Sequence, residues 1–98
     1  MAFVAGNQIV TTGTGDSDYV TLGQGEYVCQ VVWAGSAGDL DLQVGDGTSF
    51  TDALDYSGAV INITSTYAIG VMGGMSYQAD VNTHTSAATL TFHRSDAE

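Results

Sequence analysis

The chain has 98 residues, which suits one domain with a modest hydrophobic core. Eleven acidic residues stand against a single basic one, Arg94, so the formal net charge is −10. This balance argues against direct binding of DNA or RNA, whose phosphates require lysine and arginine, and against attraction to an anionic membrane. The single cysteine, Cys29, excludes an internal disulfide.

The composition is typical of an all-β protein. Proline is absent, glycine occurs 13 times, and threonine, valine and tyrosine prevail over the residues that favour helices. The first residues, MAFV, lack the basic and apolar regions of a secretory signal, and no apolar run approaches the ~20 residues of a membrane helix. We therefore expect synthesis in a cytoplasm and no membrane partner.

Apolar and polar residues alternate with a period of two along much of the chain, which predicts strands. The alternating segments are, in order, residues 7–12, 18–22, 26–34, 39–44, 59–64, 67–72, 75–82 and 88–93. In residues 39–44 the leucines and Val44 alternate with Asp39, Asp41 and Gln43. In residues 75–82 we expect one set of alternate residues inside and the other outside. The inside set is Met75, Tyr77, Ala79 and Val81, and the outside set is Ser76, Gln78, Asp80 and Asn82.

Glycine-rich and aspartate-rich turns separate these segments, and Gly73-Gly74 between two alternating runs predicts a hairpin. About seven or eight short strands at this spacing indicate a single antiparallel β-sandwich or a jelly-roll-like small barrel over residues 1–98. Residues 1–8 are expected to form an N-terminal arm, and residues 48–57 an irregular segment. Because the chain has no lysine or proline to guard a sheet edge, neighbouring subunits are expected to cover the edges, which favours a homo-oligomer.

Three aspartates within residues 38–47 are candidates for a weak cation site, because Asp39, Asp41 and Asp46 could supply the oxygen ligands of calcium. An EF-hand fails on spacing, since Val44 occupies the glycine position and no glutamate closes the loop. Asp39 and Asp41 lie about 6.7 Å apart along one strand face, within the range of glycosidase carboxylates, but a strand face offers no pocket. The simpler interpretation is an acidic outer face followed by an Asp-Gly turn.

No catalytic or cofactor-binding residue emerges. His84 and His93 lie on polar stretches and are expected at the surface, and no nucleophile elbow occurs. Cys29 alternates with core residues and is expected to be a buried, inert thiol. Phe50 and Tyr56, in the irregular segment, are the aromatic residues most suited to a partner surface.

Several stretches resemble the small all-β virion proteins of tailed bacteriophages, above all capsid decoration or cement proteins. The resemblance runs through FVAGNQ, GEYVCQVVWAG, DLDLQVGDGTSF, YAIGVMGGMSYQADV and TLTFHR. It implies a non-enzymatic, often trimeric protein without a cofactor, bound to the major capsid protein on the outer surface of the shell. Such a protein would use its N-terminal arm (Phe3, Val4, Ile9) and edge strands for contact, with Phe50 and Tyr56 as further contacts. Related phage proteins often carry proline in the Asp-Gly loop, and this chain does not.

A second resemblance competes with the first. The stretch AGDLDLQV is similar to a strand of bacterial pre-peptidase C-terminal domains, which are β-sandwich accessories that bind calcium or carbohydrate. That resemblance implies a binding module. A phage tail or fibre component is a variant of the virion interpretation.

Overall fold

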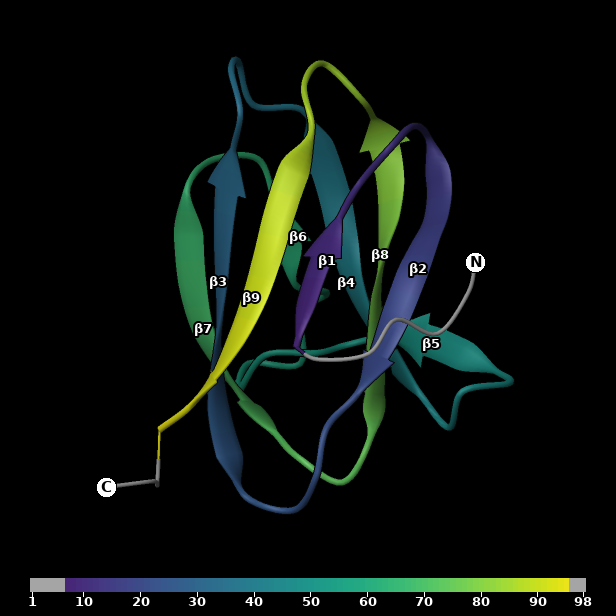
Figure 1. Ribbon diagram of the computed structural model, residues 1–98, viewed down its shortest axis with the longest axis vertical. Helices are drawn as coiled ribbons and strands as arrows, with labels where there is room; N and C mark the ends of the chain where they lie inside the picture. Colours follow the sequence, from purple (N-terminus) through teal and green to yellow (C-terminus); the bar gives the residue numbers. More distant parts are fainter. Residues whose placement is uncertain (1–6, 96–98) are drawn as a thin grey trace.

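The computed structural model describes residues 7–95, which form two antiparallel sheets packed face to face, a β-sandwich (Figure 1). The first sheet has the strand order β1 (Gln8–Val10), β9 (Ala88–Arg94), β3 (Glu26–Trp33) and β7 (Tyr67–Met72). The second has the order β2 (Gly15–Thr21), β8 (Ser76–Thr83), β4 (Asp39–Gly45) and β5 (Phe50–Asp52), and the two-residue β6 (Asn62–Ile63) also pairs with β4. The prediction of an all-β fold is thus confirmed. No helix long and apolar enough to span a membrane occurs in the described part of the chain.

The strands pair from the two ends of the chain inward. β1 pairs with β9, β2 with β8, β3 with β7, and β4 with β5, so early and late segments lie side by side throughout. Successive strands pass from one sheet to the other, except β4, β5 and β6, which all belong to the second sheet. Among the described residues no strand pairing joins the sheets, so they do not form one closed barrel.

The predicted hairpin at Gly73-Gly74 is wrong, because β7 and β8 belong to different sheets. The two glycines make a corner that packs against the turn between β2 and β3. The amide of Gly73 donates to the carbonyl of Gly25 at 2.7 Å, and the amide of Gly74 donates to the carbonyls of Leu22 and Gly23. A Cβ at Gly73 would overlap the Gly23 carbonyl oxygen, so glycine is needed for this contact. Gly74 has a positive φ of 79°.

The core lies between the two inner faces, as the alternation predicts. Leu40 and Leu42 of β4 have no exposed surface, and neither do Leu90 and Phe92 of β9. The rings of Tyr77 and Phe92 meet across the sandwich with their centroids 5.4 Å apart. Full burial of side chains of this size contributes on the order of 1.5–3 kcal/mol each.

Two outward residues of β8 were predicted to be exposed, and this prediction is wrong. Ser76 and Gln78 are 2% and 1% exposed. Their side chains hydrogen-bond to the flanking strands, Ser76 to Thr21 of β2 and Gln78 to Gln43 of β4. The rings of Tyr19 and Phe50 lie 5.5 Å apart, and the ring of Phe50 covers Gly45, which pairs with Ser76. Met75, expected inside, is 37% exposed.

The remaining predictions differ from the structure at element ends. β1 begins at Gln8, and the side-chain amide of Asn7 donates a hydrogen bond to the Phe92 carbonyl at 2.5 Å. Residues 7 and 8 of the predicted N-terminal arm are therefore part of the first sheet. Phe3 and Val4 lie outside the described residues. Within 59–64 only Asn62 and Ile63 form a strand, and the segment 48–57 contains the short strand β5.

Candidate functional site

Charge is divided between the two sheets. The strands of the second sheet contain Asp16, Asp18, Asp39, Asp41, Asp52 and Asp80. The strands of the first sheet contain no aspartate, and their two charged residues, Glu26 and Arg94, stand at strand ends. The guanidinium of Arg94 lies over the ring of Tyr27, 5.6 Å from its centroid. The sandwich therefore presents two outer faces of different electrostatic character.

The outer face of the first sheet is partly apolar, with Glu26 at the end of β3 as its one carboxylate among the described strands, and we call it the neutral face. Its residues alternate with buried ones along β1, β9, β3 and β7. They are Gln8, Val10, Val28, Gln30, Val32, Ala68, Thr89, Thr91 and His93. Val10 and Val32 are 50% and 48% exposed and both stand opposite Thr89 in the register. Away from Glu26, this face offers apolar and hydrogen-bonding groups without a carboxylate to desolvate.

The outer face of the second sheet carries Asp16, Asp39, Asp41, Asp52 and Asp80, and we call it the acidic face. Asp16, Asp80 and Asp41 are opposite one another across β2, β8 and β4. Partial burial raises the pKa of Asp80, and the charges of Asp16, Asp41 and Asp52 raise it further.

Two asparagine amides hold the carboxylates of Asp39 and Asp41. The side-chain amide of Asn62 donates to Asp39 at 2.6 Å and to Asp41 at 2.8 Å. The amide of Asn82 donates to the same two carboxylates at 3.1 and 3.2 Å. The pair therefore has hydrogen-bond donors within the protein, and these four bonds occupy about half of its acceptor capacity.

The structure does not bring Asp46 to Asp39 and Asp41. Asp46 follows the opposite end of β4, about 20 Å along the strand from Asp39. Its carboxylate accepts hydrogen bonds from the amides of Thr48 and Ser49 at 2.8 and 2.9 Å, which lower its pKa. No group of three or more ligand-type side chains arranged for a metal ion occurs among residues 7–95.

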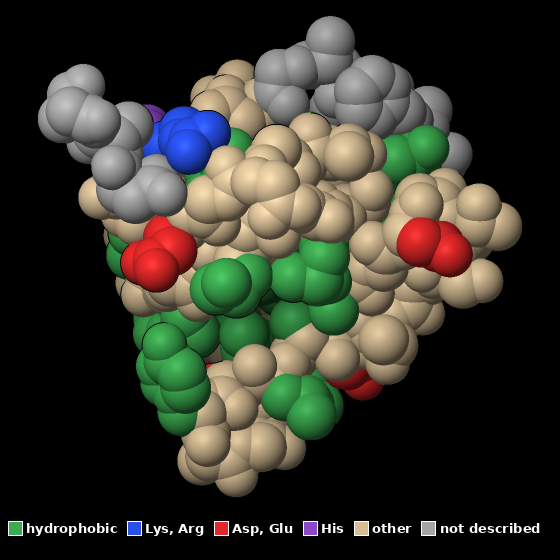
Figure 2. Space-filling view, turned by 90° about the horizontal axis from the view of Figure 1, so that it is seen from below, with side chains coloured by type: hydrophobic (Ala, Val, Ile, Leu, Met, Phe, Trp, Pro, Cys, Tyr) green, Lys and Arg blue, Asp and Glu red, His purple; other side chains and the backbone are tan. Residues whose placement is uncertain are grey.

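An apolar groove of about 490 Å³ opens at one edge of the sandwich, between β7 and the segment that contains β5 and β6. We call it the edge groove. β5 and β6 have three and two residues, too few to cover the inner face of β7. Ile69, Val71 and, from the other sheet, Val44 are consequently only partly buried. Hydrophobic side chains gather in and around this hollow in the view from the lower end of the molecule (Figure 2).

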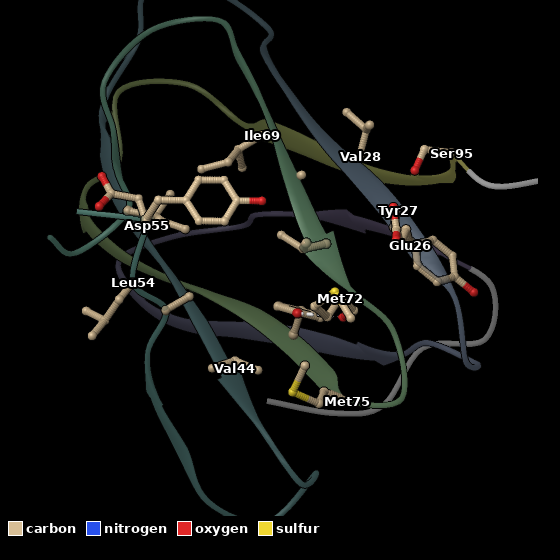
Figure 3. A pocket seen from close by; sticks show the side chains of 16 residues that line it. Glu26, Tyr27, Val28, Val44, Leu54, Asp55, Ile69, Met72, Met75 and Ser95 are labelled. Carbon is tan, nitrogen blue, oxygen red and sulfur yellow. Dashed lines mark hydrogen bonds between the residues drawn. The ribbon is translucent and has the colours of Figure 1, made fainter. Parts of the chain in front are cut away.

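The lining of the edge groove suits an apolar occupant. Ile69 and Leu54 lie on opposite sides of it, with the Leu54 side chain pointing outward at the rim, and Met72 and Met75 lie at its other end (Figure 3). The carboxylates in its lining are those of Glu26 and Asp55, and none of the described lining residues is a histidine or a cysteine. The groove can hold an apolar side chain or a strand.

A hydrogen-bonded turn presents Tyr56 beside the groove. The carboxylate of Asp55 accepts hydrogen bonds from the amides of Ser57 and Ala59 and from the Ser57 hydroxyl, at 2.9, 3.1 and 2.6 Å. These bonds lower the pKa of Asp55. Tyr56, at the tip of this turn, is fully exposed, with a relative exposure of 110%. The predicted exposure of Tyr56 is confirmed.

The other residues singled out in the sequence have varied surroundings. Ile9 is 1% exposed and belongs to the core, so its side chain is not available to a partner. Phe50 is half-buried against Tyr19. His93 is exposed as predicted, but His84 is half-buried, and its Nε2 atom is covered with no hydrogen-bond partner in the described structure. Cys29 is fully buried, which raises its pKa to about 12.

Sequence reasoning missed the neutral face and the edge groove. Both depend on which strands are neighbours, and alternation along one segment does not contain that information. A signal did exist in the distribution of aspartate, which is absent from residues 26–34, 67–72 and 88–94. Comparison with protein-family models, with curated proteins and with solved structures found no match to this chain.

Proposed function

We propose that the protein is a non-enzymatic structural protein of a phage virion, a capsid decoration or cement protein that binds the outer surface of the shell and stabilises it. The observation that carries this proposal is the division of charge between the two outer faces. The neutral face would contact the major capsid protein, and the acidic face would point to solvent.

The two faces differ in what docking would cost. A contact centred on Val10 and Val32 lies at the other end of β3 from Glu26, so it desolvates no carboxylate. It buries both half-exposed valines, with a gain on the order of 1 kcal/mol per valine. A contact through the acidic face would desolvate five carboxylates unless the partner supplied a basic group for each. A shell surface without a strong positive charge therefore favours the neutral face.

The strand pairing supports a jelly-roll arrangement of the two sheets. Pairing of the first strands with the last, β1 with β9 through β4 with β5, is the order produced when a long antiparallel ribbon wraps around a core. Jelly rolls are common in viral capsid proteins and in lectins. The fold is thus compatible with the proposal but does not separate it from a binding module.

The first experiment locates the coding sequence, because a neighbouring major capsid gene would identify the shell. Purified protein is then added to shells assembled from that capsid protein, and binding is measured by co-sedimentation. Val32→Asp, which adds a charge to the neutral face, is expected to weaken binding by about tenfold or more. Thr14→Asp adds the same charge on the exposed β1–β2 loop and is the matched control. No binding of the unmodified protein, or equal binding of the two variants, would refute the proposal.

The alternative is a β-sandwich binding module for a glycan or calcium, favoured by the fully exposed ring of Tyr56, a platform of the kind on which sugars stack. A glycan array and calcium calorimetry on the purified protein test it. Saturable binding that Tyr56→Ala abolishes would support this alternative over a structural role. A tail or fibre component remains a variant of the main proposal, distinguished by which virion part the protein binds.

A further inference from the structure

The edge strand β7 lies beside the edge groove and combines two features that rarely occur together in an isolated domain. It pairs only with β3 on one side, so the backbone groups of its other side have no strand partner among the described residues. Its six residues, YAIGVM, include no charge, lysine or proline. Edge strands of this kind are sites where another chain adds.

The edge groove would extend the core if a strand were added to β7. Successive side chains of a strand point to opposite faces, so alternate residues of an added strand would enter the groove. There they would meet Val44, Ala53 and Ile61 of the second sheet. Leu54 and Met72, each 59% exposed, would become covered at the same time.

We infer that residues 1–6 of a second copy of this chain add to β7 as a strand and fill the edge groove. The segment reads MAFVAG, and five of its six residues are apolar. Extended, it spans about 20 Å, which is the length of the six-residue β7. The other segment outside the described residues, residues 96–98, reads DAE. Its two carboxylates would meet Glu26 and Asp55 in the groove lining, which disfavours it.

The position of Asn7 favours residues 1–6 of a second copy over those of the same molecule. Asn7 pairs with Phe92 of β9, and the amide of Phe92 donates to the Asn7 carbonyl at 2.9 Å. β1 and β7 are the opposite edges of the first sheet (Figure 1) and lie three strand spacings apart, about 14 Å. Crossing that width would use about four of the six residues, too many for the remainder to run along β7.

This inference goes beyond the proposed function, because it concerns contacts between copies in solution before any shell is met. The donor edge, β1, and the acceptor edge, β7, are different surfaces of one sheet. Copies joined in this way make contacts that close into a dimer by mutual exchange or into a ring.

The test compares the full chain with a variant that lacks residues 2–6, using light scattering coupled to size exclusion over a range of concentrations. The full chain is expected to be oligomeric and the deletion variant monomeric. Met72→Lys, at the exposed end of β7, is expected to weaken self-association by about tenfold or more. Thr14→Lys adds the same charge away from the groove and is expected to leave it unchanged. A monomeric full chain, or an oligomer that survives the deletion, would overturn the inference.

Cross-linking identifies which copy supplies the segment. Val4→Cys protein is mixed with Ala68→Cys protein and treated with a short bis-maleimide, and Cys29 should stay silent because it is buried. The mixture is expected to give linked pairs that contain one molecule of each variant. If a chain carrying both substitutions is instead linked only within itself as a monomer, the groove is filled by its own segment and the inference is wrong.

Discussion

Asp16 of β2 and Asp80 of β8 are directly opposite each other in the second sheet, so two carboxylates of equal charge form a cross-strand pair. Such pairs are destabilising by roughly 0.2–1 kcal/mol. Partial burial and the neighbouring carboxylates raise the pKa of Asp80, as expected if its ionised form is disfavoured in the fold. If stability alone determined this surface, two carboxylates would not be expected opposite each other.

Replacement of Asp80 by asparagine is therefore expected to stabilise the protein at neutral pH by roughly 0.2–1 kcal/mol, measured by urea unfolding. The folded-state pKa of Asp80 lies above its ordinary value of 3.8, so the folded state binds this proton more tightly than the unfolded state. The protonated carboxyl of Asp80 contributes to the free energy of unfolding below pH 3.8. This contribution declines as the pH rises through the folded-state pKa. The gain from Asp80→Asn should accordingly vanish in acid.

Asp16→Asn is the matched control for that prediction. The two substitutions should be less than additive when combined, because either one relieves the same repulsion. Full additivity, or a destabilised Asp80→Asn variant at pH 7, would show that the pair does not repel in the fold.

Loss of the Asn62 amide is expected to destabilise the acidic face. Asn62→Ala leaves the Asp39 and Asp41 carboxylates with the amide of Asn82 alone, at a cost of about 1 kcal/mol. Thr64→Ala, at an exposed neighbouring position, is the control and should change little. Millimolar calcium is expected to leave the unfolding midpoint of the unmodified protein unchanged, and a clear rise would instead support a cation site.

Two turn aspartates are expected to shape the acid side of the stability profile. Backbone amides lower the pKa of Asp46, and the Ser57 hydroxyl and the Ala59 amide lower that of Asp55. The ionised carboxylates of Asp46 and Asp55 contribute to the free energy of unfolding above pH 3.8. This contribution is lost as the pH falls through their folded-state pKa values. In Asp46→Asn and Asp55→Asn, the free energy of unfolding should therefore fall less as the pH is lowered, as measured by acid unfolding. An unchanged acid limb in the double variant would contradict these contacts.

The corner between the sheets predicts opposite outcomes for two nearby glycines. Gly73→Ala should cost about 1–3 kcal/mol, because its Cβ would overlap the Gly23 carbonyl oxygen. The nearest atom to a Cβ at Gly70 is the Tyr27 carbonyl oxygen, 3.9 Å away, so there is room for a methyl group. Gly70→Ala should therefore be neutral or slightly stabilising. Thermal unfolding of the two variants checks the difference, and equal midpoints would show that the corner does not need glycine.

Strands with one buried face were predictable from the sequence. The alternation in residues 39–44 assigns Leu40 and Leu42 to the core, and both are fully buried because nothing competes with the two-residue period there. The same reasoning misplaced Gln78, which is buried between its cross-strand neighbours, Tyr19 of β2 and Gln43 of β4. Such burial is a tertiary effect that local periodicity does not contain.

The candidate surfaces were less predictable than the strands. Tyr56 was identified because an aromatic residue in a polar turn has no core to join, and it is exposed. Ile9 was assigned to an arm, but its pairing with Leu90 brings it into the core. The neutral face requires the strand order β1-β9-β3-β7, which brings together segments from both ends of the chain. Only the topology places Val10 and Val32 on one surface.

The most direct test of the central claim is a cryo-electron microscopy map of the shell, identified from the neighbouring capsid gene, with and without the added protein. Added density is expected on the outer surface, with β1, β9, β3 and β7 against the major capsid protein and the acidic face toward solvent. The shell should also melt at a higher temperature when the protein is bound. A shell without added density, or one contacted through Asp16, Asp41 and Asp80, would contradict the account.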